Sequence, residues 1–149
     1  MKIEGDYQLA ADIETVWRDL NDPNILNECI PGCESIEQIG PDEFECVITN
    51  KIGPVKATFK SVLRITNSNP PSSYTLSGEG KGGPAGFGKG SADVDLEANE
   101  DGTLLKYAAE LSVGGKIAQV GARLISSATK KLSDKFFKAF AGRYEEQES

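Results

Sequence analysis

The chain has 149 residues, of which 38% are hydrophobic and 26% are charged. These values exclude the disordered and fibrous classes, and the length suffices for one compact domain but not for two of full size. The net charge of −7 disfavours binding to nucleic acid, because its phosphates repel an acidic protein. We expect a single domain over residues 1–144 and a short acidic tail over residues 145–149.

The N-terminal segment has no apolar stretch of signal-peptide length, and no segment approaches the roughly 18 apolar residues of a membrane span. Both features predict a cytoplasmic protein. Its three cysteines, Cys29, Cys33 and Cys46, are then expected to be reduced and to pack as small apolar side chains. Because the chain has no histidine, the sequence does not support a zinc site built on them.

The N-terminal part of the chain is predicted to form a strand and two short helices. Residues 2–10 alternate between apolar and polar side chains, which indicates a half-buried strand. Asp12 is a candidate N-cap for the first helix. Asp22 followed by Pro23 is a start signal for the second helix, and Pro31-Gly32 ends it.

From Glu34 to Val113 the apolar residues recur at every second position, and turn residues separate the segments. This pattern predicts six strands in an antiparallel meander. The glycine-rich run Gly78–Gly90 is interpreted as a mobile hairpin or, alternatively, as a flap at a cavity mouth with Phe87 as its large apolar residue. The run also matches GxGxxG, but a strand is predicted where a phosphate-binding motif needs a helix.

A long amphipathic helix is predicted from Lys116 to Tyr144, because apolar residues recur every fourth position. We expect its first half, to Ala128, to face a cavity and its second half to pack as solid core. Gly121 inside such a helix costs about 1 kcal/mol relative to alanine. It could leave room for a ligand or allow a strand to approach closely, and the sequence leaves both open. Residues 116–143 carry seven basic and one acidic side chain.

This order of elements predicts an α+β fold with a curved antiparallel sheet of about seven strands around a long C-terminal helix. It resembles the helix-grip fold of START-like and plant pathogenesis-related (Bet v 1-like) domains, whose sheet wraps the helix around an apolar cavity. Histidine-dependent nucleophilic catalysis is excluded, and most carboxylates fall in turns or on the polar side of strands. We therefore expect a binding protein without enzymatic activity and without a required cofactor.

Four stretches carry a more specific resemblance. They are CIPGCESIE at Cys29–Glu37, KIGPVKATFK at Lys51–Lys60, GEGKGGPAGFGKGSADVDL at Gly78–Leu96 and VGGKIAQVGARLI at Val113–Ile125. Together they resemble the CoxG family of carbon monoxide dehydrogenase proteins, from Gly5 to about Phe140. The resemblance implies a non-catalytic accessory protein of a molybdenum-containing CO dehydrogenase or related molybdenum hydroxylase, linked to membrane anchoring or assembly of that enzyme.

Members of the family often carry a Pro-rich linker and an apolar anchor after this domain, whereas this sequence ends in the acidic residues 145–149. The resemblance therefore implies peripheral contact at the inner face of the membrane, or contact through the partner enzyme. The fold and the family together indicate an apolar, lipid-like ligand, with an isoprenoid quinone as the candidate. The sequence leaves the oligomeric state open, and a homodimer is one option.

Apolar residues of the predicted strands and of the first half of the helix are the candidate ligand contacts. The expected cavity lining is Ile52, Val55, Phe59, Leu76, Phe87, Leu111, Ile117, Val120, Gly121 and Leu124. The basic side of the helix is the candidate docking surface for a membrane or an acidic partner. It comprises Arg123, Lys130, Lys131, Lys135 and Lys138. The alternative is a docking module with a filled core and no ligand.

Overall fold

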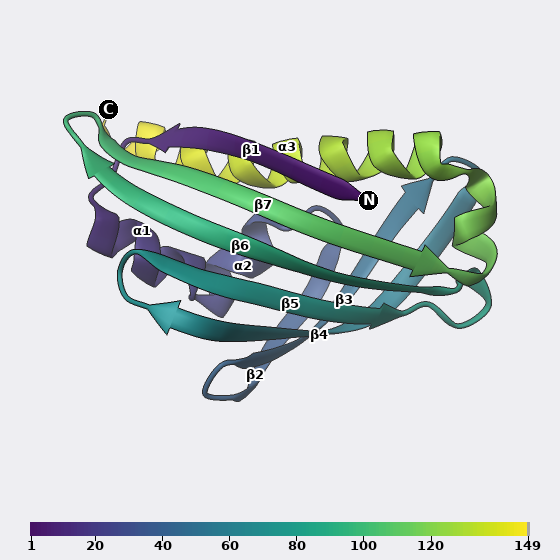
Figure 1. The fold of residues 1–149 in the computed structure, drawn as a ribbon. Helices are drawn as coiled ribbons and strands as arrows, with labels where there is room; N and C mark the ends of the chain where they lie inside the picture. Colours follow the sequence, from purple (N-terminus) through teal and green to yellow (C-terminus); the bar gives the residue numbers. More distant parts are fainter. Residues whose placement is uncertain (149) are drawn as a thin grey trace.

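The computed structural model describes the backbone of residues 1–148 and the side chains of residues 1–145. Its elements in chain order are β1 (Lys2–Leu9), α1 (Ile13–Leu20), α2 (Pro23–Cys29), β2 (Cys33–Gly40), β3 (Glu43–Ile52), β4 (Val55–Asn69), β5 (Ser73–Lys81), the 3-10 helix η1 (Gly83–Ala85), β6 (Phe87–Asn99), β7 (Gly102–Gly114), the 3-10 helix η2 (Gly115–Val120) and α3 (Ala122–Glu148) (Figure 1). The predicted α+β order is confirmed. The side chains of most of the expected acidic tail lie outside the described residues.

The seven strands form one antiparallel sheet in the order β1-β7-β6-β5-β4-β3-β2. Figure 1 shows the sheet curving around α3, with α1 and α2 near the C-terminal end of that helix. Strands β2 to β7 follow one another as the predicted meander, and β1 pairs with β7. The helix-grip architecture is therefore the one that the order of elements indicated.

The two short helices begin at the predicted caps. An Asp12 carboxylate oxygen accepts a hydrogen bond from the backbone N–H of Thr15 at 2.8 Å. Asp22 accepts one from the backbone N–H of Asn24 at 2.9 Å, and Pro23 occupies the first turn, where its missing N–H costs nothing. These caps hold α1 and α2 as the link between the first two strands.

The interior near α1 and α2 is a closed apolar core. Leu9 and Leu105 of the sheet are fully buried there, as are Phe140 and Tyr144 of α3. The rings of Phe140 and Tyr144 meet edge to face at 5.4 Å, and Phe137 stacks on Tyr7 at 4.5 Å. The expectation that the later part of the helix packs as solid core is confirmed at Phe137 and Phe140.

A buried hydrogen bond joins the end of α3 to α1 and makes the core sensitive to alkali. The Tyr144 hydroxyl donates to Asp19 Oδ2 at 2.9 Å, and both residues are buried. Burial is the main cause that raises the pKa of Tyr144, and the Asp19 carboxylate raises it further. The folded protein thus holds Tyr144 protonated, whereas the unfolded chain loses this proton near pH 10.

We therefore expect stability to be constant below about pH 9 and to fall as the pH rises above 10. Tyr144→Phe should cost about 1–3 kcal/mol at pH 7, because Asp19 loses its buried donor, and should weaken this alkaline dependence. Urea denaturation of both proteins at pH 7 and at pH 10.5 measures the two effects. An identical pH dependence in wild type and variant would contradict the assignment to Tyr144.

The start of the last helix differs from the prediction. Residues Gly115–Val120 form a 3-10 helix, and α3 begins only at Ala122. Gly121 lies between the two helices with φ at +97°, a conformation that L side chains rarely adopt. Gly121 is therefore a joint and not an interior helix residue, so the interpretation based on its cost inside a helix is wrong.

The glycine-rich run also differs from the prediction, because most of it is paired strand. Strand β5 continues to Lys81 and β6 begins at Phe87, which leaves only residues 82–86 as the connection. Gly78 pairs with Gly90, and Gly80 pairs with Gly88. The alternation of glycine with other residues is a strand pattern that its composition concealed.

Candidate functional site

The candidate site is the concave face of the sheet beside the first half of α3. Side chains that are directly paired in an antiparallel sheet point to the same face, and the faces alternate along each strand. Phe44, Leu96 and Leu105 lie in the closed core, so their positions in the register identify the concave face. Every second residue away from them must then point to this face as well.

Much of this face is not covered by the protein's own side chains. Phe44 is buried, but further along the same strand pair Ile48 and its partner Phe59 are only partly buried. The centre of the face is lined by small residues. These are Gly78, Gly80, Gly88, Gly90, Ala92 and Ala109. Small side chains opposite a helix leave space, and the apolar residues around them remain partly accessible.

The predicted cavity residues of the strands fall on this face with one exception. Ile52, Val55, Phe59, Leu76 and Leu111 all point to the concave side by their register, and each is partly buried. Leu76 also packs against the closed core. The five side chains come from four strands, so the sheet collects residues that are up to about 60 positions apart in the sequence.

Phe87 is the exception, and its assignment to the cavity is wrong. It pairs with Lys81 and Gly114, one position out of step with the concave Gly80 and Gly88. Its ring therefore lies on the convex face, over Gly114, where no Cβ blocks it. Phe87 is 54% exposed.

The remaining predicted residues lie around the joint before α3. Ile117 in η2 is buried, and Val120 is partly buried. Leu124 is 38% exposed and lies over Gly53 at the β3–β4 turn. Gly121 is exposed, and a Cβ added to it would have no neighbour within 4 Å. These residues edge the site rather than form its floor.

Sequence reasoning missed part of the surface that the register brings together. The missed apolar residues are Ile48, Leu63, Ala92, Ala109 and Val113, and the missed polar ones are Asn50 and Ser61. The alternation within β3 and β7 carried this signal, but the pairing partners were needed to assign each strand's faces. Asn50 Nδ2 donates to the Pro31 carbonyl at 3.1 Å, which ties the turn after α2 to the same end of β3.

The titratable groups on this face are held in their neutral forms. Burial raises the pKa of the Cys46 thiol to about 11, so it is protonated at neutral pH. Burial also raises the pKa of Tyr107 and of Tyr74. Among the residues that the structure describes, no group of three or more acidic or cysteine side chains is arranged to hold a metal ion. The arrangement is suited to holding an apolar molecule.

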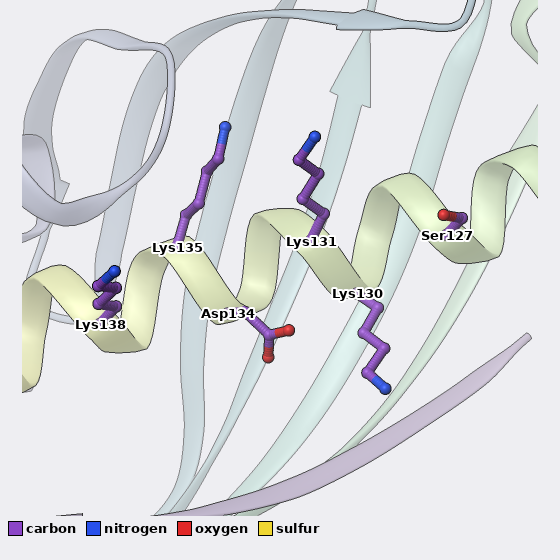
Figure 2. Close-up of a pocket in the computed structure, with 6 residues that line it drawn as sticks. All are labelled: Ser127, Lys130, Lys131, Asp134, Lys135 and Lys138. Atoms are coloured by element: carbon purple, nitrogen blue, oxygen red, sulfur yellow. The ribbon is translucent and has the colours of Figure 1, made fainter.

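A second candidate surface is the outer side of α3. Figure 2 shows Lys131 and Lys135 extending to one side of the helix, and Lys130 and Asp134 extending to the other. With Ser127 and Lys138 these residues line a shallow pocket of about 310 Å³. The Tyr7 hydroxyl donates to Asp134 Oδ1 at 2.6 Å. The structure thus brings four of the five predicted docking residues together.

Arg123 is exposed and precedes Lys130 by seven residues, about two helical turns, but it does not line this pocket. We call Lys130, Lys131, Lys135 and Lys138 the α3 lysine face. It is opposite the stripe that contains Ile125 and Phe136, so these lysines do not belong to the interior.

Residues 5–144 match the family model of the carbon monoxide dehydrogenase protein CoxG. The chain belongs to this family. The match includes the concave strands and the α3 lysine face, so the CoxG model covers both candidate surfaces. The family assignment agrees with the resemblance carried by the four sequence stretches. The comparison with curated proteins found no match.

Solved structures show where the CoxG fold recurs. A conserved protein from Geobacillus kaustophilus is 35% identical, with a TM-score of 0.90 over 98% of this chain and 96% of that one. A START superfamily protein from Mycobacterium smegmatis is 14% identical, with a TM-score of 0.73 and 98% of both chains covered. The Zhui aromatase/cyclase from Streptomyces sp. R1128 is 13% identical, with a TM-score of 0.69 over 100% and 96% of the two chains.

These neighbours establish the START-like helix-grip fold, and one of them is an enzyme, so the fold by itself does not decide between binding and catalysis. None of the helices in the described part of the chain is both long enough and apolar enough to cross a membrane.

Proposed function

We propose that this CoxG-family protein is a non-catalytic accessory protein of a molybdenum CO dehydrogenase-type enzyme and that it carries an apolar, lipid-like ligand. The candidate ligand is an isoprenoid quinone, held between the concave face and the first half of α3. The observation that supports this proposal is the incomplete burial of Ile48, Phe59 and Leu111, which point inward but lack full cover. A filled core would bury them.

Apolar contact supplies most of the binding free energy in this proposal. At about 25 cal/mol per Å² of apolar surface removed from water, a tail that buries about 300 Å² contributes roughly 7 kcal/mol before the entropy cost of ordering it. A quinone ring needs few polar partners. Ser61, on the concave face beside Gly80, and Asn50 near the β3–β4 turn are polar side chains among apolar neighbours.

The absence of a catalytic assembly supports the non-catalytic part of the proposal. The chain has no histidine, and the cysteine nearest to the centre of the site, Cys46, is buried with a raised pKa. A buried neutral thiol is a poor nucleophile. Carrying a ligand needs none of these groups, and no cofactor is required.

The α3 lysine face is the proposed docking surface for the enzyme. Its four lysines are exposed, and the adjacent Asp134 already accepts a hydrogen bond from Tyr7. An acidic patch on the dehydrogenase would complement this charge and speed association. We place the protein in the cytoplasm, at the inner face of the membrane where an apolar quinone would be exchanged.

The ligand proposal can be tested with the purified protein. Organic extraction followed by mass spectrometry should reveal a quinone or another lipid. Titration of the extracted protein with a short-chain quinone should quench the emission of Trp17, which lies against Tyr74 in the core, and should raise the melting temperature. A protein that yields no lipid and shows neither response would be the docking module with a filled core, and the carrier proposal would be wrong.

A further inference from the structure

The basic residues of the chain are segregated at one end of the molecule. Residues 46–78, 80–92 and 111–133 carry four, two and four basic side chains, ten of the 16 in the chain, and none of its 23 acidic ones. These stretches include the end of β3, the start of β4, the end of β5, the start of β6, the end of β7 and the start of α3. In a meander these strand ends lie together, at the right of Figure 1.

Lysines face one another across the strands at this end. Lys51 pairs directly with Lys56, and Lys60 pairs directly with Lys81. Like charges directly opposite in a sheet destabilise it. Within the part of the chain that the structure describes, none of these four lysines forms an ion pair. The fold therefore concentrates positive charge without internal neutralisation.

Exposed apolar side chains lie among these lysines. Phe87 continues the row of Lys60 and Lys81 on the convex face. Leu124 lies over the β3–β4 turn between Lys51 and Lys56. These are two of the four large apolar side chains that the structure leaves exposed. The 3-10 helix η2, which carries Lys116, lies next to the β5–β6 connection, because Gly115 approaches Gly86 closely.

We propose that this end of the molecule binds the surface of an anionic lipid bilayer. We call it the basic end and define it by Lys51, Lys56, Lys60, Lys81, Phe87 and Leu124. Lysines at the headgroup level attract lipid phosphates, while single aromatic and aliphatic side chains enter the boundary with the acyl chains. The charge complementarity and the isolated apolar side chains on turns and strand ends fit a bilayer better than the broad, flat contact of a protein partner.

This inference rests on the proposed function and adds the source of the ligand. Ile52 and Val55, on the concave face, flank the same β3–β4 turn that carries Lys51 and Lys56. A bilayer at the basic end would therefore border the apolar surface proposed to hold the ligand. An apolar molecule could pass from the bilayer to that surface without crossing a long path through water.

The test is sedimentation of the purified protein with vesicles of phosphatidylcholine alone and of phosphatidylcholine mixed with phosphatidylglycerol. We expect binding to the mixed vesicles only, weakened by salt. Lys60→Ser/Lys81→Ser should lower the partition coefficient roughly 30-fold, the combined contribution of two lysines at an anionic surface. Phe87→Ser should lower it roughly tenfold or more.

Matched controls lie elsewhere on the molecule. Lys135→Ser/Lys138→Ser makes the same change in net charge on the α3 lysine face, and Ile39→Ser removes an apolar side chain that is 47% exposed on β2. Both should bind vesicles like the wild type. Equal losses in the control and test variants, or no vesicle binding, would overturn the inference. Binding of the basic end to the dehydrogenase instead of vesicles would also overturn it.

The outcome can be separated from that of the proposed function. Lys60→Ser/Lys81→Ser should still bind a short-chain quinone in solution without vesicles, because both lysines are on the convex face. Quinone binding without vesicle binding would remove only the membrane inference. Vesicle binding without quinone binding would remove the carrier proposal. Thermal unfolding of each variant identifies any that fail to fold.

Discussion

Phe140→Ala should lower the free energy of unfolding by about 3–5 kcal/mol, the usual cost of deleting a buried phenyl ring. Phe140 is fully buried, and its ring lies 6.0 Å from that of Phe136 and 5.4 Å from that of Tyr144. The variant would leave a cavity that rigid neighbours from the sheet and α1 cannot close. A domain of this size is typically stable by about 5–15 kcal/mol, so the loss is a large fraction of the total.

The matched control is Leu124→Ala at the other end of the same helix, which should cost less than about 1 kcal/mol because Leu124 is 38% exposed. Urea denaturation followed by circular dichroism measures both variants without ligand. The contrast tests whether α3 has one tightly packed half and one loosely covered half. Similar costs at the two positions would mean that the helix is packed uniformly, and the ligand proposal would lose its structural basis.

Local patterns were sufficient to predict most of the architecture. The caps at Asp12 and Asp22 predicted the two short helices, because the hydrogen bonds that form a cap involve residues two or three positions away. The alternation in the strands predicted the meander for the same reason. These features depend on neighbours in the sequence, so the sequence pattern alone can reveal them.

The errors arose where tertiary structure decided between two local options. The helical period continued through Gly121, but the chain must turn there from the end of β7 onto α3, and a residue at φ of +97° makes that turn. Gly78–Gly90 has a loop composition, yet its glycines are paired strand residues that keep the concave face low. Phe87 was assigned to the cavity because of its size, and the register places it on the opposite face.

These corrections change which variant can test the cavity. Gly121→Phe is unsuitable, because the backbone there disfavours any side chain and an added Cβ would meet no neighbour within 4 Å. Ala109 is a better position. It points to the concave face, where it pairs with Ala92 on one side and Ile3 on the other, and it is partly buried. Ala108, its neighbour in β7, is exposed on the convex face and provides the control.

Ala109→Phe should lower the affinity for a quinone at least about tenfold, because the new ring would occupy space that several carbons of the ligand need, at about 0.8 kcal/mol for each methylene displaced. Ala108→Phe should leave the affinity unchanged. Titration of both variants by Trp17 fluorescence measures the affinities. Unchanged affinity in Ala109→Phe would place the ligand elsewhere.

The same pair of variants separates the carrier from a docking module with a filled core, even if no ligand has been identified. A ring added to a packed core forces its neighbours apart and costs about 1–3 kcal/mol of stability. A ring added to an uncovered apolar surface gains contacts with Ile3 and Leu111 and should leave the stability equal or higher. Urea denaturation of Ala109→Phe against Ala108→Phe therefore reports whether the space beside the first half of α3 is empty, which the carrier proposal requires.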